Sequence, residues 1–191
     1  MSNRELFVTI NSGKLKGKKI YLPSKVTTRS TKSIIKESYF NTIQFDIIDK
    51  NFIELFAGSG SMGIEAISRG AKRSFFIEKD KRAYDVLINN LKSLNIDNYT
   101  ALNGDTFVKF SSILEKIDEK SYFYLDPPFD IRDGMEGIYE DSFKLIESIP
   151  KELCELITIE HISRLKPPKT IGHFKHTKSK KFGKTTLTYY I

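Results

Sequence analysis

The sequence predicts an α/β fold in which helices cover both faces of a parallel sheet. From residue 52 onward, short apolar segments alternate with longer amphipathic segments, as they do in a parallel sheet with crossover helices. A glycine-rich turn follows the first apolar segment, and an acidic residue ends the second. Because no linker is long enough to separate domains, we expect one domain over 1–191, with 1–50 as an appended extension and 51–191 as the core.

The expected elements follow from these apolar segments and from the turn residues between them. In the core, strands are expected at 52–56, 74–77, 99–102, 122–125 and 153–162, and helices at about 61–69, 81–94, 106–119 and 136–149. In the extension, 6–22 predict a β-hairpin and 31–48 predict a helix. At the C-terminal end, strands 169–174 and 185–191 are expected to form an antiparallel hairpin around a basic turn.

The composition is typical of a folded domain with a substantial core. Of the 191 residues, 39% are hydrophobic and 12% are aromatic, which excludes a disordered or fibrous chain. The single cysteine, Cys154, cannot form an internal disulfide, and no apolar run approaches the length of a membrane span. The N-terminal residues lack the apolar stretch of a signal peptide. We therefore expect a soluble, cytoplasmic protein.

Charge is divided unevenly along the chain. Residues 1–37 hold nine basic and two acidic side chains, and 164–191 hold eight basic and no acidic ones, whereas 38–163 hold 14 basic and 22 acidic ones. One interpretation is that the two ends are flexible and solubilising. Because both ends also carry strand-like patterns, we favour a basic face that binds a polyanion.

The glycine-rich turn has the pattern of a nucleotide-binding loop. The strand FIELF leads directly into AGSGSMGIEA, in which Gly58, Gly60 and Gly63 match G-x-G-x-x-G between a strand and a helix. Glycine lets the backbone approach a ligand closely, and a helix N-terminus attracts negative charge. Glu78 follows Gly58 by 20 residues and ends the second strand, where an acid can accept hydrogen bonds from ribose hydroxyls.

Two ligands fit this loop, a dinucleotide and S-adenosylmethionine. Glu54, in the first strand, would repel a pyrophosphate but can attract a methionine ammonium, directly or through water. Asp105, in the loop after the third strand, can accept a hydrogen bond from an adenine amino group, and Phe107 can cover the ring. Each acid also has a structural alternative, because Glu54 can hold the loop and Asp105 is a natural N-cap for the next helix.

A stiff proline corner follows the fourth strand, with the sequence Asp126-Pro127-Pro128-Phe129. The two prolines restrict the backbone and hold the Asp126 carboxylate and the Pro127 carbonyl at the carboxyl edge of the sheet, where open α/β folds bind ligands. These two oxygens can accept both N–H groups of a planar exocyclic amine while Phe129 stacks on its ring. Methyl transfer to such a nitrogen depends mainly on alignment and charge stabilisation, which this corner can provide.

With these motifs the chain resembles the bacterial 16S rRNA guanine-N2 methyltransferases, within the class I S-adenosylmethionine-dependent fold. The segments that carry the resemblance are GKLKGKKIYLP, TRSTKSIIKESYFN, ELFAGSGSMGIEAISRGA, FFIEKD, NGDTF, LDPPF and KFGKTTLTYY. The family usually has Asp where Glu54 stands, and Arg-Pro-Thr where this chain has Arg29-Ser30-Thr31. The resemblance implies a seven-stranded, mostly parallel Rossmann-like sheet with a reversed last strand.

The resemblance also implies an activity and a role for each motif. It implies methylation of a guanine exocyclic amino group, with S-adenosylmethionine as the cofactor. The catalytic set is then Asp126, Pro127, Pro128 and Phe129. The expected cofactor-binding residues are Glu54, Phe56, Gly58, Ser59, Gly60, Met62, Glu78, Lys79, Asp105 and Thr106. Phosphate contacts are expected at Lys14, Lys16, Lys18, Lys19, Arg29, Lys32, Lys36, Lys178, Lys180, Lys181 and Lys184.

The expected partner is 16S rRNA or a small-subunit assembly intermediate, and the protein is expected to be a monomer. Because stacking hides the guanine amino group, the target base must be unpaired or flipped out. The histidines and the lone cysteine show no ligand spacing, so no metal site is expected.

Three alternatives remain open at this point. The acceptor can be a DNA adenine or a protein glutamine, since both carry planar amines. A nicotinamide-dependent reductase would need a Tyr-x-x-x-Lys pair after the glycine loop, whereas Tyr21 and Lys25 have this spacing but precede the loop. The third alternative is an rRNA-binding assembly factor without enzymatic activity, against which the intact DPPF sequence argues.

Overall fold

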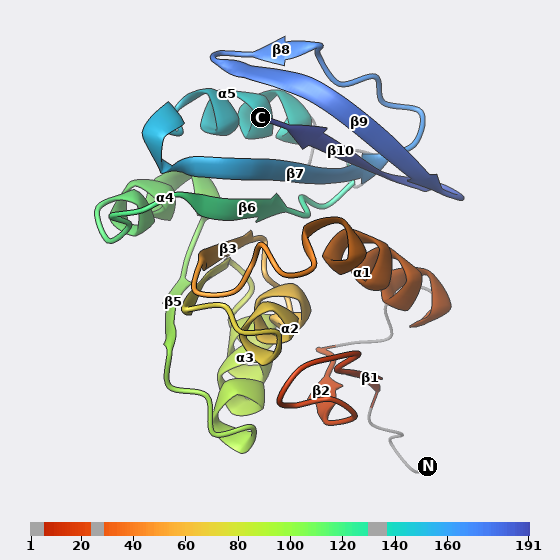
Figure 1. Ribbon diagram of the computed structural model, residues 1–191, viewed down its shortest axis with the longest axis vertical. Helices are drawn as coiled ribbons and strands as arrows, with labels where there is room; N and C mark the ends of the chain where they lie inside the picture. Colours follow the sequence, from red (N-terminus) through yellow and green to blue (C-terminus); the bar gives the residue numbers. More distant parts are fainter. Residues whose placement is uncertain (1–5, 24–28, 130–136) are drawn as a thin grey trace.

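A mixed β-sheet forms the centre of the computed structural model, which describes residues 6–23, 29–129 and 137–191 (Figure 1). Its strands are β3 (Asn51–Leu55), β4 (Arg73–Glu78), β5 (Tyr99–Asn103), β6 (Ser121–Leu125), β7 (Cys154–Ile162), β8 (Thr170–Ile171), β9 (Phe174–Phe182) and β10 (Thr185–Tyr190). They lie in the order β5-β4-β3-β6-β7-β10-β9-β8, with β3 to β7 parallel and the last three antiparallel to their neighbours. The order reverses at β3 and β6, so ligands of such a sheet bind at the carboxyl ends of these strands.

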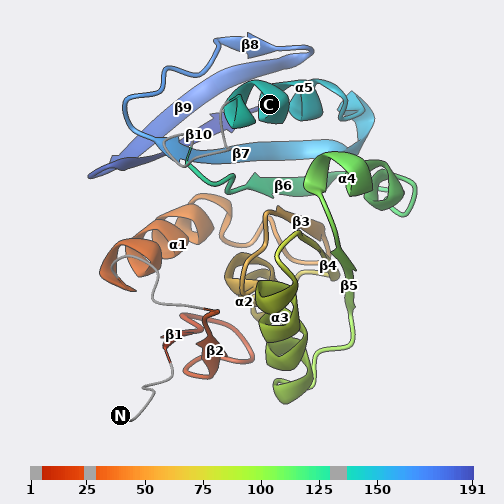
Figure 2. The ribbon, with the colours of Figure 1, turned by 180° about the vertical axis from the view of Figure 1, so that it is seen from behind.

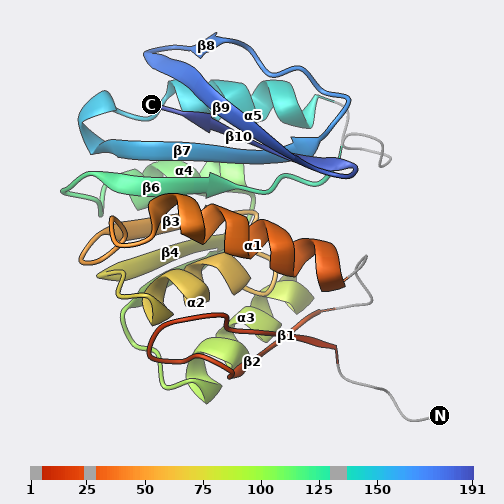
Figure 3. The same ribbon diagram turned by 45° about the vertical axis from the view of Figure 1, so that its right-hand side comes forward.

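Helices cover both faces of this sheet, as the strand–helix alternation predicts. One face carries α1 (Arg29–Ile43), α2 (Ser61–Ser68), α3 (Lys81–Ser93) and the hairpin of β1 (Phe7–Thr9) and β2 (Lys19–Tyr21) (Figure 3). The other face carries α4 (Thr106–Leu114) and α5 (Ile138–Glu147), and a short 3-10 helix, Lys151–Leu153, precedes β7 (Figure 2). Both α1 and α4 end earlier than expected. Within the described ranges, none of the helices combines the length and apolar character that a membrane crossing requires.

Each face of the sheet buries its own core. The side chains of β3 and β6 are buried along the whole strand, as parallel strands between two helical layers usually are. On the α1 face, Tyr39 packs against Tyr124 with the ring centroids 5.0 Å apart and against Phe52 at 6.0 Å. On the other face, Phe110 of α4 packs against Phe123. These contacts fix the strand ends on which the candidate site is built.

The C-terminal part of the sheet corrects the sequence prediction in two respects. The sheet has eight strands rather than seven, because Thr170–Ile171 adds a short edge strand beside β9. The basic segment expected as a turn is itself strand β9, and the turn lies at Gly183, where φ is 61°. Lysine-rich composition suggests a loop, but β9 pairs with the buried strand β10 while most of its own side chains extend into solvent.

A buried carboxylate joins the N-terminal extension to the core. Glu65 of α2 is fully buried, and its oxygens accept hydrogen bonds from the backbone N–H groups of Asn11 at 2.8 Å and Ser12 at 3.0 Å. The same carboxylate pairs with Lys36 of α1 at 3.0 Å and with Arg69 at 2.9 Å. A charge removed from water needs this many partners, so Glu65 holds both the hairpin and α1 on the core.

The loop of the hairpin also makes a close backbone contact with the end of α2. Gly13 has a φ of 82°, and a Cβ added there would lie 1.8 Å from the carbonyl oxygen of Ser68. The next N–H, that of Lys14, donates to the same carbonyl at 2.8 Å, and the Ser68 hydroxyl donates to the carbonyl of Ser12 at 2.6 Å. Only glycine permits both the left-handed backbone and this approach.

We expect Gly13→Ala to destabilise the protein by about 3 kcal/mol or more, since the left-handed backbone alone costs about 1–2 kcal/mol and the collision forces a backbone shift. Urea denaturation measures this loss. Gly17→Ala is the matched control, because Gly17 has a similar φ of 81° but no atom within 4 Å of its added Cβ. The control should lose only about 1–2 kcal/mol, and equal losses in the two variants would contradict the close contact.

Candidate active site

The glycine-rich turn leads from β3 to α2 through left-handed backbone. Phe56, Gly58 and Gly60 have φ angles of 62°, 55° and 76°. The left-handed backbone favours glycine at Gly60, and a Cβ there would lie 2.3 Å from a terminal methyl of Leu87, which would have to move. A Cβ added to Gly58 would meet no atom within 4 Å. The loop therefore leaves open space at Gly58, which is where a ligand can approach the backbone.

Glu54 of β3 holds the beginning of α2. Its carboxyl group is 4% exposed and accepts hydrogen bonds from the backbone N–H groups of Gly63 at 2.7 Å and Met62 at 3.3 Å. Burial raises the pKa of Glu54 to about 8, and these two hydrogen bonds oppose the rise only in part. A Cβ on Gly63 would lie 2.3 Å from the ring of Phe76, so the glycine is needed for the close approach. Glu54 thus holds the glycine loop, as one of the two interpretations of the sequence expects, and its contact with the methionine ammonium stays a prediction.

Glu78 connects the end of β4 to the glycine loop. Its Oε2 accepts a hydrogen bond from the Gly58 N–H at 2.6 Å, and its Oε1 accepts one from the Asp80 N–H at 2.7 Å. The carboxylate is partly exposed. Each of its oxygens keeps a lone pair, so the group can still accept hydrogen bonds from two hydroxyls of a ligand.

Asp105 lies at the corresponding position after β5. It caps α4 by accepting the Phe107 N–H at 2.9 Å, and Lys79 donates to its other oxygen at 2.9 Å. Burial raises the pKa of Asp105, but the hydrogen bonds from Lys79 and Phe107 outweigh burial and lower it overall. The ring of Phe107 packs edge-on against Phe56 of the glycine loop, with the centroids 5.7 Å apart. The two loops therefore form neighbouring walls of one site.

The proline corner brings Asp126 beside the glycine loop. The Asp126 N–H donates to the carbonyl of Leu55, the last residue of β3, at 3.3 Å. The Asp126 carboxylate is 30% exposed and lies 3.7 Å from the ammonium of Lys32 on α1. The negative charge of Asp126 raises the pKa of Lys32, against the effect of burial, so the ammonium stays charged. Pro127 is buried, whereas Pro128 and Phe129 are partly exposed.

Sequence reasoning missed a second acid next to this corner. Glu160 of β7 is 7% exposed, and its carboxyl group accepts a hydrogen bond from the hydroxyl of Tyr124 on β6 at 2.7 Å. Burial, together with the charge of Asp126, raises the pKa of Glu160 to about 8, although Lys32 opposes this. The available signal was a single acid within the apolar run 156–162, which marks a buried group that needs a partner.

The structure therefore brings most of the predicted site residues to one edge of the sheet. Glu78 ends β4, Asp105 comes two residues after β5, and Asp126 directly follows β6, so all three lie at the carboxyl ends of strands in the β5-β4-β3-β6 part of the sheet. The remaining predicted cofactor residues differ in exposure: Lys79 is exposed, whereas the side chains of Ser59, Met62 and Thr106 are buried.

The predicted RNA-contacting side chains are mostly exposed, with one correction. Lys36 is 2% exposed, donates to the Thr9 carbonyl at 2.8 Å and pairs with Glu65, so it is a structural residue and is not available to a phosphate. Lys180 is half-buried and donates to Thr42 of α1 at 3.0 Å. The side chain of Arg29 lies outside the described residues. The exposed members of the set are Lys14, Lys16, Lys18, Lys19, Lys32, Lys178, Lys181 and Lys184.

Among the residues that the structure describes, no group of three or more His, Cys, Asp and Glu side chains is placed to hold a metal ion.

A doubly wound sheet with its last long strand reversed, and with a glycine loop and acids at its carboxyl edge, defines this protein as a class I methyltransferase. The family described as "Conserved hypothetical protein 95" matches residues 8–191, and the chain belongs to this family. The "Ribosomal RNA small subunit methyltransferase D" of Escherichia coli is 31% identical over 140 residues, which are 73% of this chain and 67% of the relative.

Two further comparisons extend the match over the whole chain. The Bacillus subtilis protein named "Putative rRNA methyltransferase YlbH" is 28% identical over 182 residues, which are 94% of this chain and 96% of the relative. A solved structure, "Putative methyltransferase yhhF from Escherichia coli", superposes with a TM-score of 0.75 and 26% identity and covers 97% of both chains. The expected fold class and enzyme class are thus confirmed.

The raised pKa of Glu54 predicts a pH-dependent stability. Because the pKa is about 8 in the folded protein and near 4.5 otherwise, the folded state retains a proton that the unfolded state releases. The resulting stabilisation is complete below pH about 4.5 and is lost as pH rises through about 8.

Urea denaturation of the protein and of Glu54→Gln between pH 5 and 8 tests this. The free energy of unfolding of the parent, relative to the variant, should fall with rising pH, by up to about 1.4 kcal/mol per pH unit. Glu160 is present in both proteins, so its own titration largely cancels. A difference that does not change with pH would mean that Glu54 is ionised throughout.

Proposed function

We propose that this protein transfers a methyl group from S-adenosylmethionine to the exocyclic amino nitrogen of a guanine in 16S rRNA. The observation that carries the proposal is the position of Asp126, whose backbone N–H is bonded to Leu55 immediately before the glycine loop. The carboxylate thus lies where a cofactor bound at that loop would meet an acceptor. The names of the curated relatives support rRNA as the class of substrate.

The residues of the loop fit S-adenosylmethionine, which supplies an electrophilic methyl group on sulfur. Gly58 leaves room for close approach, Glu78 can accept the ribose hydroxyls, and Asp105 can accept the adenine amino group while Phe107 covers the ring. Glu54 contributes by fixing α2 in place. The rest of the proposed binding set is Phe56, Ser59, Gly60, Met62, Lys79 and Thr106.

The proline corner provides what the acceptor nitrogen needs. The lone pair of a guanine amine is delocalised into the ring, which makes the nitrogen a poor nucleophile. Hydrogen bonds from the amine to the Asp126 carboxylate and the Pro127 carbonyl orient the nitrogen and favour its pyramidal, more reactive form. Phe129 stacks on the base. Because the nitrogen becomes positively charged as the new bond forms, the Asp126 carboxylate stabilises that charge and can take the proton that leaves.

Lys32 changes partner in this proposal. At 3.7 Å its ion pair with Asp126 is long, and the lysine side chain is 47% exposed, so little energy is lost when an acceptor amine replaces it. The freed ammonium can then bind a phosphate of the incoming RNA. The exposed lysines of the hairpin and of β9 extend the phosphate contacts on either side.

The oligomeric state, the cellular location and the form of the rRNA substrate are part of the same proposal. We infer that the protein acts as a monomer in the cytoplasm, on 16S rRNA or on an assembly intermediate of the small subunit, with residues 1–50 serving mainly to bind RNA. The acceptor base is unpaired or flipped out when it is methylated, because stacking would otherwise bury its amine.

Transfer of a labelled methyl group to separate acceptors tests the proposal. We expect incorporation into 16S rRNA, and digestion to nucleosides should place the label on N2 of guanine. DNA and a glutamine-containing protein serve as the matched alternatives, since both carry planar amines. Label on DNA adenine or on glutamine, with none in RNA, would overturn the RNA assignment and leave the methyltransferase class intact.

Asp126→Ala tests the role of the carboxylate. We expect kcat to fall by about 10²–10³-fold, because the charge aimed at the reacting nitrogen is lost. The dissociation constant of S-adenosylmethionine, measured by calorimetry, should change less than about twofold, since Asp126 holds the acceptor. Asp118→Ala, which removes an exposed acid after α4, is the control and should retain full activity. Normal turnover by Asp126→Ala would refute the assigned role.

A further inference from the structure

A pocket of about 310 Å³ lies in the C-terminal half of the sheet. It is walled by the carboxyl end of β7, by the middle of β9 and β10, and by the segment 165–169 that leads from β7 to β8. β7 is the neighbour of β6, and their register pairs Ile159 with Leu125. The pocket therefore begins one strand away from Asp126, toward the same edge of the sheet. It lies on the α5 face, where His161 packs against Tyr139, whereas Asp126 faces Lys32 of α1.

A chain of four hydrogen-bonded side chains runs along one wall of this pocket. It links His161 Nε2 to Thr188 Oγ1 at 2.8 Å, Thr188 Oγ1 to Ser179 Oγ at 2.9 Å, and Ser179 Oγ to His176 Nε2 at 2.9 Å. At its inner end, His161 Nδ1 lies 2.9 Å from the carbonyl oxygen of Ile162. His161 is 1% exposed, whereas His176 at the other end is partly exposed.

The direction of every hydrogen bond in this chain is determined. A carbonyl oxygen can only accept, so His161 Nδ1 carries a hydrogen. Burial lowers the pKa of His161, so the ring is neutral and its Nε2 accepts from Thr188. Thr188 must then accept from Ser179, and Ser179 must accept from His176 Nε2–H. Both hydroxyl hydrogens are used, and His176 Nδ1 is the ring nitrogen left for a ligand. Because phosphate oxygens only accept hydrogen bonds, Nδ1 binds one when the ring also carries a proton there.

The charged groups that line the pocket are cationic. Lys166 and Lys169 line it, and within the described part of the chain neither forms an ion pair. The backbone N–H of His176 donates to the carbonyl of Lys169 at 2.9 Å, which holds the lysine segment beside the imidazole. The described lining contains no carboxylate, and residues 164–191 contain no acid at all. Two ammonium groups and one imidazole around a small pocket suit a phosphate group.

We propose that this pocket is a phosphate-binding subsite that takes one backbone phosphodiester of the RNA, held by Lys166, Lys169 and His176. The choice of RNA as the source of the phosphate rests on the proposed function, whereas the phosphate chemistry rests on the pocket alone. RNA fits better than a free nucleotide because the surrounding C-terminal strands carry further lysines without any acid, which suits a polymer of phosphates. A phosphodiester bound here would fix the register of the strand that presents its base at Asp126.

Proton NMR of the histidine ring signals tests the pocket directly. The chain has three histidines, and the variants His173→Gln and His176→Gln assign the two on the C-terminal strands. Addition of inorganic phosphate, and separately of a ten-nucleotide single-stranded RNA, should shift the His176 signal. His173 is exposed and does not line the pocket, so its signal is the internal control. A His176 signal that does not move, or moves no more than that of His173, overturns the proposal.

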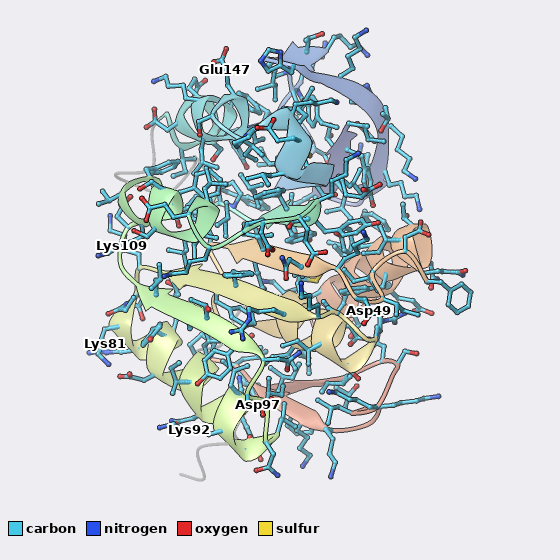
Figure 4. The ribbon with its side chains drawn as sticks, turned by 60° about the vertical axis from the view of Figure 1, so that its left-hand side comes forward. Asp49, Lys81, Lys92, Asp97, Lys109 and Glu147 are labelled. Carbon is cyan, nitrogen blue, oxygen red and sulfur yellow. The ribbon has the colours of Figure 1, made fainter. Side chains whose placement is uncertain are left out.

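Binding measurements on charge variants test the source of the phosphate. In Lys166→Ala/Lys169→Ala, the Kd for RNA should rise about 10-fold, and the slope of log K against log salt should decrease by about 1. The control Lys92→Ala/Lys116→Ala removes the same charge at the opposite, amino edge of the sheet, where Lys92 lies at the end of α3 near Asp97 (Figure 4). The control should change the Kd less than about twofold.

The outcomes separate this inference from the proposed function. If inorganic phosphate shifts His176 but the pocket variant binds RNA like the control, the RNA phosphodiester is excluded as the ligand. If wild-type protein shifts His176 with RNA yet methylates no RNA, the proposed function fails and the subsite stands. The NMR experiment uses the unaltered pocket, so the proposal stays open to refutation even where the double variant does not fold.

Discussion

The carboxylate of Glu65 is the constraint on which the assembly of this protein depends. It is fully buried, and two backbone N–H groups together with Lys36 and Arg69 satisfy it. If one partner were removed, an uncompensated charge would be left in the interior, so the hairpin, α1 and α2 must come together as one unit. Lys36 also fixes the rotation of α1, and one helical turn earlier Lys32 reaches Asp126. The extension is thus coupled to the active-site edge through a single buried charge.

At the active-site edge, burial also controls the charge of two carboxyl groups. Glu54 and Glu160 flank Asp126 on the neighbouring strands, and burial raises both of their pKa values to about 8. The two acids are therefore largely protonated near pH 7, whereas the partly exposed Asp126 faces the ammonium of Lys32. Three ionised carboxylates so close together would repel the phosphates of an RNA substrate. The arrangement concentrates negative charge at the one carboxylate that the proposed chemistry needs and keeps it paired until an amine arrives.

How far the sequence predicts this structure depends on how local each signal is. The glycine loop, Glu78 and the proline corner were predictable because the residues that determine their backbone conformation and spacing lie within short stretches of the sequence. The burial of Lys36 was not, since its partner Glu65 lies 29 positions away on another helix. Strand β9 was hidden for a similar reason: its lysines suggest a loop, and only pairing with β10 makes it a strand. Glu160 gives a weak local signal, and its significance depends on Tyr124 and Asp126 of the next strand.

The uneven charge of the sequence also acquires a structural explanation. Lys180 of β9 donates hydrogen bonds to Thr42 and Ser38, so the basic C-terminal strand is attached to the helix of the basic N-terminal extension. Two segments that stand at opposite ends of the chain are therefore joined on the α1 side of the sheet, around an acidic core. At moderate salt, charges reinforce one another only within a screening length of about 10 Å. Cations brought together on one side of the sheet therefore attract a polyanion far better than cations on two separate tails. The core can then keep the acids that its cofactor chemistry requires without losing affinity for a negatively charged substrate.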